Sequence, residues 1–198
     1  MSKLPQQIVN QAQFLPEGGV LSPKTFLHLG SRAAIDQAFS RLCKMGKLIR
    51  VARGSYVLPI LSRFGSRAPS PEKVVMSLAE QNGETVVPHG ASAANVLGLT
   101  QQVPIREVYL TSGKTRELKI GQSTVLIKHA PRWLLALGQR PAGAAVRALA
   151  WMGPLHADAS LVSLRRSLPI AEWKILASAR ATLPSWMAKA IGKEAISG

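Results

Sequence analysis

The chain has 198 residues, of which 46% are hydrophobic, and its 25 Lys and Arg against 10 Asp and Glu give a formal net charge of +15. This length fits one large or two small domains, no apolar run is long enough for a membrane span, and the N-terminus lacks the apolar core of a secretory signal. The single cysteine, Cys43, excludes an intrachain disulfide and favours a cytoplasmic location, while the charge predicts a polyanionic partner, nucleic acid first, with a merely solubilising or ribosome-associated basic surface as the alternative.

The N-terminal part begins with three predicted helices. The first covers "LPQQIVNQAQ". A short second helix starts at Ser22 and Pro23, because serine can cap a helix and proline suits its first turn, and it ends at "LGS". Ser31 caps a third helix that runs to about Met45 and is closed by Gly46. Two helices joined by a short turn that contains glycine predict a helix-turn-helix.

The third helix has two distinct faces. Its apolar residues follow the spacing i, i+3, i+4, i+7 and predict a buried stripe of Ile35, Ala38, Phe39, Leu42 and Met45. The opposite face carries small, amide, hydroxyl and charged residues, namely Ala33, Asp36, Gln37, Ser40 and Lys44, with Arg32 and Arg41 on its flanks. Such side chains reach base edges and phosphates in a major groove, although a solvated helix face would also satisfy them.

A basic hairpin follows the third helix directly. The stretch "GKLIRVARGSYVLP" at 46–59 holds two β-prone runs around a tight turn at Gly54. A helix-turn-helix followed by such a hairpin predicts a winged-helix DNA-binding domain over residues 1–65. The residues expected to contact DNA are Lys24, Thr25, Arg32, Gln37, Ser40, Arg41, Lys44, Lys47, Arg50 and Arg53.

A second domain is expected after a linker. The stretch "SRFGSRAPSP" at 62–71 replaces hydrophobic periodicity with Gly, Ser, Pro and Arg, so residues 66–71 are predicted as a linker and 72–198 as the second domain. There Pro71 opens a helix, "EVYLT" and "ELKIG" are predicted to pair as a hairpin through "SGKTR", and "STVLIKHA" follows as a strand. From Pro131 onward the pattern is helical, and each of four helices carries one tryptophan, interpreted as core anchors. The fold class is therefore α+β.

The sequence also resembles a known family. The run "SRAAIDQAFSRLCKMGKLIRVARGSYVLP" resembles the winged-helix module of the AbiEi-type antitoxin family of type IV toxin–antitoxin systems. The stretches "VPHGASAANVLGLTQQVPIREVYLTSGKTRELKIG" and "LPSWM" resemble the antitoxin domain of a compact branch of that family. The resemblance implies that the first domain binds inverted repeats upstream of its own operon and represses it. It further implies that the second domain counteracts a cognate nucleotidyltransferase-like toxin.

No constellation of catalytic or metal-ligating residues stands out. "SGKT" at 112–115 lacks the earlier glycine of a phosphate-binding loop, because that position is Val108. The four histidines are too far apart in the sequence for a local metal motif, and His89 with Ser92 in "PHGASAAN" reads as a loop before a helix capped by Ser92. We therefore predict no enzyme, no metal and no cofactor. A secondary basic surface is predicted in the second domain, formed by Lys114, Arg116, Arg165 and Arg166. Lys114 and Arg116 are expected as exposed charges, and Arg165 and Arg166 as a solvated face or an added phosphate or toxin contact.

Two alternatives stay open at this point. The chain could be a plain winged-helix regulator whose second domain senses a ligand or forms a dimer. It could also be an enzyme that acts on nucleic acid, with the winged helix serving for delivery, although no catalytic cluster supports that.

Overall fold

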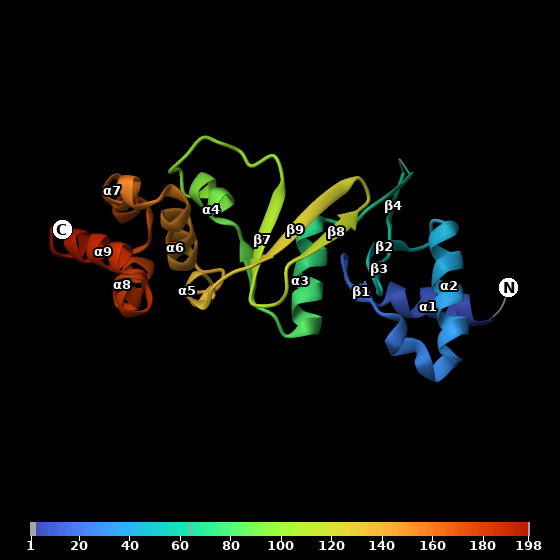
Figure 1. Cartoon of the computed structure of the whole chain (residues 1–198). Helices are drawn as coiled ribbons and strands as arrows, with labels where there is room; N and C mark the ends of the chain where they lie inside the picture. Colours follow the sequence, from blue (N-terminus) through green and yellow to red (C-terminus); the bar gives the residue numbers. More distant parts are fainter. Residues whose placement is uncertain (1–2, 64, 198) are drawn as a thin grey trace. The chain divides into compact units, whose positions relative to one another are not determined.

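The computed structural model of the chain describes residues 3–63 and 65–197 (Figure 1). Helices alternate with small sheets, in agreement with the α+β class. The backbone contacts divide the chain into two compact units: a first unit of Met1–Glu84 and Arg116–Leu126, and a second unit of Thr85–Thr115 and Ile127–Gly198.

The helical start of the first unit follows the sequence pattern closely. Helix α1 covers Lys3–Gln13, the 3-10 helix η1 covers Pro23–Leu29, and α2 covers Arg32–Lys44. The Ser22 side chain accepts a hydrogen bond from the Lys24 amide, and that of Ser31 accepts one from Ala34 at 3.3 Å. Both caps are those expected, because each satisfies an amide that the first turn leaves without a helical partner.

The buried side of α2 forms the centre of the first unit. Ile35, Ala38, Phe39 and Leu42 are buried and pack with Phe26 of η1 and Ile8 of α1. The prediction that Met45 continues this stripe is wrong, since Met45 is 55% exposed. Met45 is the C-cap residue, where the chain leaves the helix, so the helical spacing no longer decides where its side chain points.

An antiparallel sheet covers the core beside α2. Its strands are β1 (Val20–Leu21), β3 (Ser55–Val57) and β2 (Ile49–Ala52), in the order β1-β3-β2. The hairpin predicted after the third helix is thus confirmed, with Arg50 opposite Tyr56 and Gly54 at a positive φ of 74° in the turn. The Tyr56 ring packs on Phe39 with 4.7 Å between the ring centroids. Helix α2 and the β2–β3 hairpin therefore share one core.

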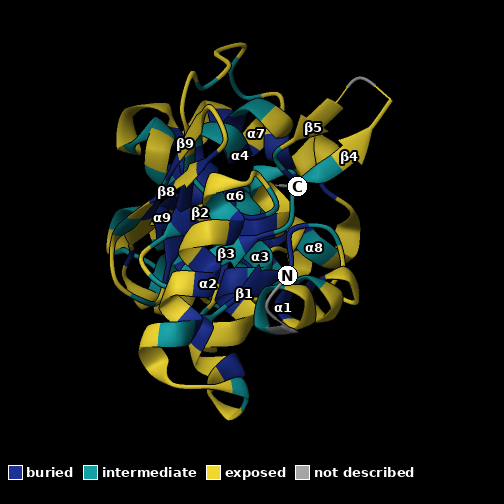
Figure 2. Ribbon diagram, turned by 90° about the vertical axis from the view of Figure 1, so that its right-hand side faces the viewer, coloured by how far each residue is buried: buried dark blue, intermediate teal, exposed yellow. Residues whose placement is uncertain are grey.

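The segment expected as a linker is partly ordered. Strands β4 (Ile60–Ser62) and β5 (Gly65–Arg67) pair as a second antiparallel hairpin, in which Ile60 lies opposite Arg67. This hairpin is largely exposed (Figure 2), and Leu61 on it is 81% exposed. Backbone pairing orders this segment although its composition lacks a strand-like alternation.

Helix α3 (Pro71–Asn82) belongs to the first unit, not to the second as the expected domain ranges placed it. The Val20 amide donates to the Ser77 hydroxyl at 3.1 Å, and the Gln81 side chain donates to the Val20 carbonyl. Gly18 has a φ of 82°, and a Cβ there would lie 2.7–2.9 Å from atoms of Lys73 and Val74. These contacts bind α3 to the chain around β1, so the compact units differ from the ranges 1–65 and 72–198.

A later segment completes the first unit. Strand β8 (Arg116–Ile120) and the start of β9 (Ser123–His129) lie in it, and β8 contacts β2. Arg116 forms a two-point ion pair with Glu84, from Nη1 to Oε1 at 3.0 Å and from Nη2 to Oε2 at 2.7 Å. Residues 116–126, distant in sequence from the rest of the first unit, therefore pack within it.

The four-stranded sheet corrects one predicted pairing. Strand β6 (Val86–Pro88) pairs antiparallel with β7 (Glu107–Thr111), and the strand order β6-β7-β9-β8 makes β9 the neighbour of β7. The predicted β7–β8 hairpin through residues 112–115 is wrong. Residues 112–115 instead connect strands that are not adjacent, because β8 and β9 turn at Gly121–Gln122 and β9 inserts between β7 and β8.

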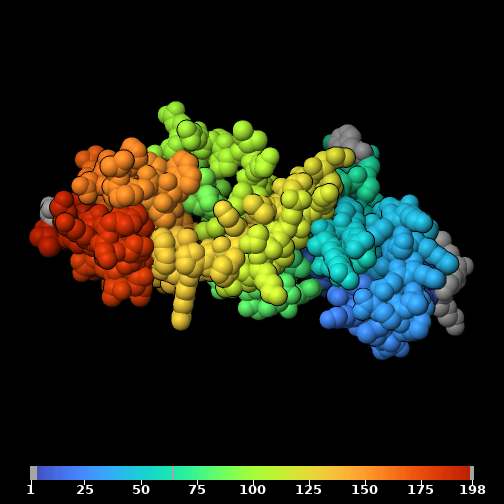
Figure 3. Space-filling model, in the orientation of Figure 1, coloured from blue at the N-terminus to red at the C-terminus, as the bar shows by residue number. Residues whose placement is uncertain are grey.

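The remaining helices of the second unit agree with the predicted helical segments. They are α4 (Gly90–Val96), α5 (Arg132–Leu135), α6 (Pro141–Met152), η2 (Pro154–His156), α7 (Ala157–Ser167), α8 (Ile170–Ser178), η3 (Ala179–Thr182) and α9 (Ser185–Ser197). The orange and red helices α6–α9 form one closely packed body in the space-filling view (Figure 3). Trp173 is buried in their core with Trp133 and Trp186 packed against it, but Trp151 is 39% exposed and is not a core anchor.

None of the helices that the structure describes is long and apolar enough to cross a membrane.

Candidate nucleic-acid interface

The exposed face of α2 gathers most of the residues predicted to contact DNA. Gln37, Ser40 and Lys44 are all exposed, and their spacing of three and four residues aligns them along one stripe of the helix. Arg41 is exposed beside this stripe. Amide, hydroxyl and ammonium groups thus lie on the exposed side of the helix along about two turns.

An ion pair lies at the start of this face. Arg32 Nε donates to the Asp36 carboxylate at 2.8 Å, one helical turn away, and both side chains are about half exposed. The pair neutralises the only carboxylate on the face among the described residues of α2. Asp36 therefore does not repel a phosphate backbone as a lone carboxylate would.

The β2–β3 hairpin extends the basic surface. Arg53 is exposed at its turn, and Arg50 is exposed on β2, where its Nε donates to the Ala52 carbonyl at 3.4 Å. Lys47 is half-buried and lines a cavity of about 200 Å³ together with Arg41 and Met45. The structure thus brings the hairpin cations Lys47, Arg50 and Arg53 into the same unit as the α2 face.

The start of η1 holds the two remaining predicted contacts. Lys24 and Thr25 are both exposed. The Thr25 hydroxyl donates to the Ser22 carbonyl at 2.8 Å, so it retains lone pairs but not a free hydrogen. All ten predicted DNA contacts therefore lie in the first unit, and nine of them are exposed.

Cys43 does not behave as a reactive thiol at this surface. Burial raises the pKa of the Cys43 thiol, while the nearby positive charge of Arg50 acts in the opposite direction. Burial also raises the pKa of Tyr56, which contacts the same core. The thiol thus stays protonated at neutral pH, and packing accounts for its position.

The four residues of the predicted secondary basic surface have different surroundings. Lys114 is exposed, but Arg116 is not an exposed charge as expected, because its ion pair with Glu84 leaves only 23% of its side chain exposed. Arg165 and Arg166 are exposed on α7, and the Arg165 guanidinium lies 5.0 Å above the Trp173 ring. Arg116 thus has a structural partner, and Arg165 covers an aromatic core residue.

Comparison with protein families gives one match. The model of a family of unknown function, DUF6088, matches residues 7–162. The chain belongs to this family. Comparisons with curated proteins and with solved structures find no significant match.

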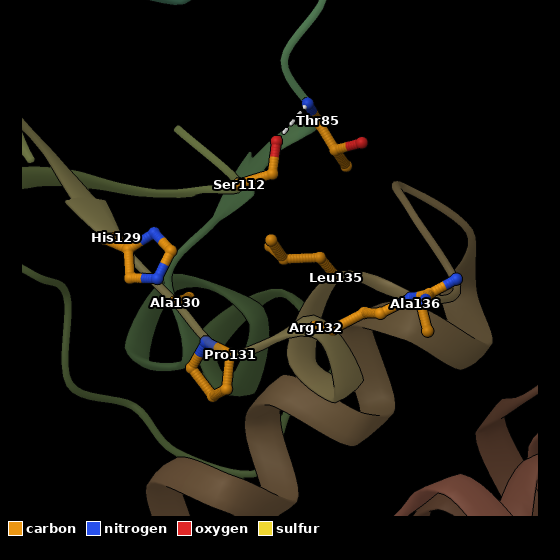
Figure 4. Close-up of a pocket in the computed structure, with 8 residues that line it drawn as sticks. All are labelled: Thr85, Ser112, His129, Ala130, Pro131, Arg132, Leu135 and Ala136. Carbon is orange, nitrogen blue, oxygen red and sulfur yellow. Dashed lines mark hydrogen bonds between the residues drawn. The ribbon is translucent and has the colours of Figure 1, made fainter. Parts of the chain in front are cut away.

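The matched region of this DUF6088 member also contains a basic hollow in the second unit that the sequence analysis missed. A cavity of about 540 Å³ is lined by Thr85, Ser112 and residues of α5 (Figure 4). The Thr85 amide donates to the Ser112 hydroxyl at 3.0 Å. His129 lines it from the end of β9, and the ring Nδ1 donates to the Gly113 carbonyl at 2.8 Å. His129 also lines an adjoining cavity with Lys128 and Arg147.

Arg147, which lines the adjoining cavity, is the residue that the sequence could have revealed. It is only 2% exposed and lies in the middle of α6, in the apolar run "AAVRALA". A charged residue inside an apolar helix predicts a buried charge that needs hydrogen-bonding or ionic partners. His89, expected in a loop before Ser92, is in fact the N-cap of α4 and accepts from the Ala91 amide at 3.2 Å.

The part of the chain that the structure describes contains no group of three or more His, Cys, Asp or Glu side chains arranged to hold a metal ion.

Proposed function

We propose that this protein is a DNA-binding repressor of its own operon that also acts as an antitoxin. The single observation that carries the first half is the exposed α2 face with Gln37, Ser40 and Lys44 beside a hairpin with an arginine at its turn. A helix that enters the major groove needs a solvent-facing stripe of such donors and acceptors, and a hairpin cation supplies a phosphate or minor-groove contact.

The order of elements supports a winged helix. Helix α1, strand β1, η1, helix α2 and the β2–β3 hairpin follow one another, and β1 closes the sheet beside β3. In this proposal α2 is the recognition helix and residues 49–57 form the wing. Inverted repeats in duplex operator DNA are the expected target.

The antitoxin half rests on the resemblance to AbiEi-type antitoxins. The stretches that carry it, "NVLGLTQQVP" and "YLTSG", lie in the second unit, which packs its own core of helices α6–α9. The proposed partner is a nucleotidyltransferase-like toxin encoded beside this chain. A plain regulator without antitoxin activity is the competing proposal.

The test separates the two activities with full-length variants. The double variant Arg50→Ala with Arg53→Ala should abolish repression of a reporter placed behind the chain's own upstream region, and it should still protect cells from the toxin. Lys174→Ala with Lys189→Ala removes the same two charges from exposed sites on α8 and α9, and should leave repression unchanged. Retained repression in the hairpin variant would refute the wing. A wild-type chain that represses but protects no cell would favour the plain regulator.

A further inference from the structure

A buried arginine that pairs with no carboxylate among the described residues lies at the edge of a hollow in the second unit. Arg147 is 2% exposed, and its Nη1 donates to the Gly138 carbonyl at 2.8 Å and to the Leu134 carbonyl at 3.5 Å. Its Nε has no hydrogen-bond partner among the described residues. A buried cation normally has a carboxylate partner, because two carbonyls do not neutralise a full charge.

The hollow beside Arg147 is uniformly basic. Its volume is about 380 Å³, within the range of small-molecule sites, and its charged or titratable lining residues are His89, Lys128, His129 and Arg147. No carboxylate is among the described residues that line it. The Leu134 carbonyl that holds Arg147 Nη1 belongs to another lining residue, so the guanidinium lies at this wall.

The two histidines present hydrogen-bonding groups here. His89 Nδ1 accepts from the Ala91 amide, so in the neutral ring the hydrogen is on Nε2, which can donate. Burial, and then the charge of Lys128, lower the pKa of His89 and favour this neutral donor. His129 donates from Nδ1 to the Gly113 carbonyl, so Nε2 is the ring nitrogen that remains for a ligand.

An aromatic residue completes the hollow. Trp151 lines it and is 39% exposed, unlike the buried Trp173. His89 and Trp151 also line a second hollow of about 600 Å³, so a planar group stacked on the indole has space on either side. Indole faces stack with nucleobases without regard to sequence.

We propose that this hollow binds a mononucleotide unit, with Arg147 and Lys128 contacting its phosphate and Trp151 stacking on its base. This inference is independent of the proposed DNA recognition by α2, because none of its residues lies in the first unit. A phosphate dianion would give the Arg147 guanidinium an anionic partner, and it would accept a hydrogen bond from His89. The same chemistry is offered by a free nucleotide and by the phosphorylated end of a nucleic acid strand.

Calorimetric titration of the full-length chain tests the site with AMP, adenosine and inorganic phosphate at fixed ionic strength. AMP should bind with one-to-one stoichiometry, phosphate more weakly, and adenosine without a measurable heat. Lys128→Ala should weaken AMP binding about tenfold through the loss of a charge-assisted hydrogen bond. Lys189→Ala removes the same charge from the exposed face of α9 and should have no effect. Absence of AMP binding, or equal weakening by both variants, would overturn the proposal.

Further variants separate the roles of the lining residues. Trp151→Leu should weaken AMP about tenfold and leave phosphate unchanged, because only the base loses its stacking partner. Arg147→Lys retains the positive charge and is the control for unfolding, whereas Arg147→Met removes the charge. If Arg147 only ties α5 to α6, a folded Arg147→Met protein retains AMP binding, and this result refutes the phosphate role. A loss of fold shifts the decision to Lys128→Ala and Trp151→Leu.

The source of the ligand is assigned by a second pair of titrations. Short single-stranded oligonucleotides with a 5′-phosphate or a 5′-hydroxyl are compared in the Arg50→Ala, Arg53→Ala background, which lacks the hairpin cations. A preference for the phosphorylated strand that Lys128→Ala removes indicates a strand end. AMP binding without this preference indicates a free nucleotide. Loss of AMP binding in the hairpin background would overturn the second-unit site, while DNA binding that fails with AMP binding intact affects only the proposed function.

Discussion

Phe39 of α2 and Tyr56 of β3 pack ring against ring, with their centroids 4.7 Å apart and their planes inclined by 50°. Phe26 of η1 also packs edge-on against Phe39, with 5.5 Å between the ring centroids. One buried ring thus joins the helix proposed to read DNA to both the preceding helix and the hairpin. A change at Phe39 is therefore expected to disturb the whole proposed reading head.

Truncation of Phe39 should be costly. Phe39→Ala should lower the free energy of unfolding by about 3–5 kcal/mol, as a fully buried phenylalanine loses its packing and leaves a cavity. Tyr56→Phe retains the ring contact and should cost less than about 1.5 kcal/mol, the range of one hydrogen bond. Urea denaturation of both variants measures the difference. Equal losses would show that ring packing does not join these elements.

Arg53, in the proposed wing, should act on every DNA sequence alike. Arg53→Ala should weaken binding to operator and random duplex by the same factor, and should lower the slope of log affinity against log salt by about 0.9. Fluorescence anisotropy over a range of salt concentrations gives both quantities. Lys189→Ala, which removes an exposed charge from the second unit, is the matched control. An unchanged slope for Arg53→Ala means that the hairpin turn does not touch phosphate.

Gln37 should instead affect sequence preference. It lies in the middle of the exposed α2 stripe, and its amide can make a bidentate contact with adenine. Gln37→Ala should relax the preference at one operator position by about 1–3 kcal/mol. Selection of binding sites from a random pool compares it with Lys44→Ala, which should lower affinity and keep the preferred sequence. The same selected sequence from both variants would remove Gln37 from the reading face.

Two of the ion pairs in the first unit, Arg116–Glu84 and Arg32–Asp36, should differ in their contribution to stability. Glu84 and Arg116 have 15% and 23% of their side chains exposed, whereas Asp36 and Arg32 have 50% and 55%. Arg116→Ala should therefore lower the free energy of unfolding by more than about 1 kcal/mol, since it removes the cation paired with the mostly buried Glu84 carboxylate. Arg32→Ala should lower it by less. Chemical denaturation at two salt concentrations checks this, because salt should weaken the Arg32 pair more. The reverse ranking would contradict the geometry.

Glu172 should contribute to the pH dependence of stability. A hydrogen bond from Arg140 and another from the Ala142 amide hold the pKa of this carboxyl below its usual value of 4.5. A lowered folded-state pKa means that the stabilisation is present above pH 4.5 and is lost as the pH falls through the folded value. Glu172→Gln should thus be less stable at neutral pH and flatten the loss below pH 4.5. Thermal unfolding from pH 3 to 7 measures it, and parallel curves would exclude the contribution.

Local patterns predicted the helices and the β2–β3 hairpin, but not the partner of β7. Ile35, Ala38, Phe39 and Leu42 repeat with the helical period, so the buried side of α2 could be derived from spacing alone. Met45 could not, because the helix ends there. The partner of β7 also could not, since β9 reaches it only after the chain has passed through β8, and no short-range signal encodes that order.

The candidate sites show the same division. The α2 face and hairpin charges are consecutive in sequence and were predicted together. The hollow around Arg147 is built from β9, α4 and α6, which are far apart in the chain, and its residues gather only through folding. The one local sign was an arginine inside an alanine-rich helix.

The return of residues 116–126 to the first unit has a consequence for synthesis on the ribosome. Chains are made from the N-terminus, at about 5–20 residues per second. Glu84 emerges before Arg116, and β2 emerges before β8, so the contacts of β8 cannot form when residue 84 leaves the exit tunnel. The first unit therefore cannot make all of its contacts before the segment up to Leu126 has been synthesised. By then the strands β6 and β7 have already been made. A nascent chain that stalls in this interval exposes an unfinished sheet edge, so the timing of translation enters the assembly of this fold.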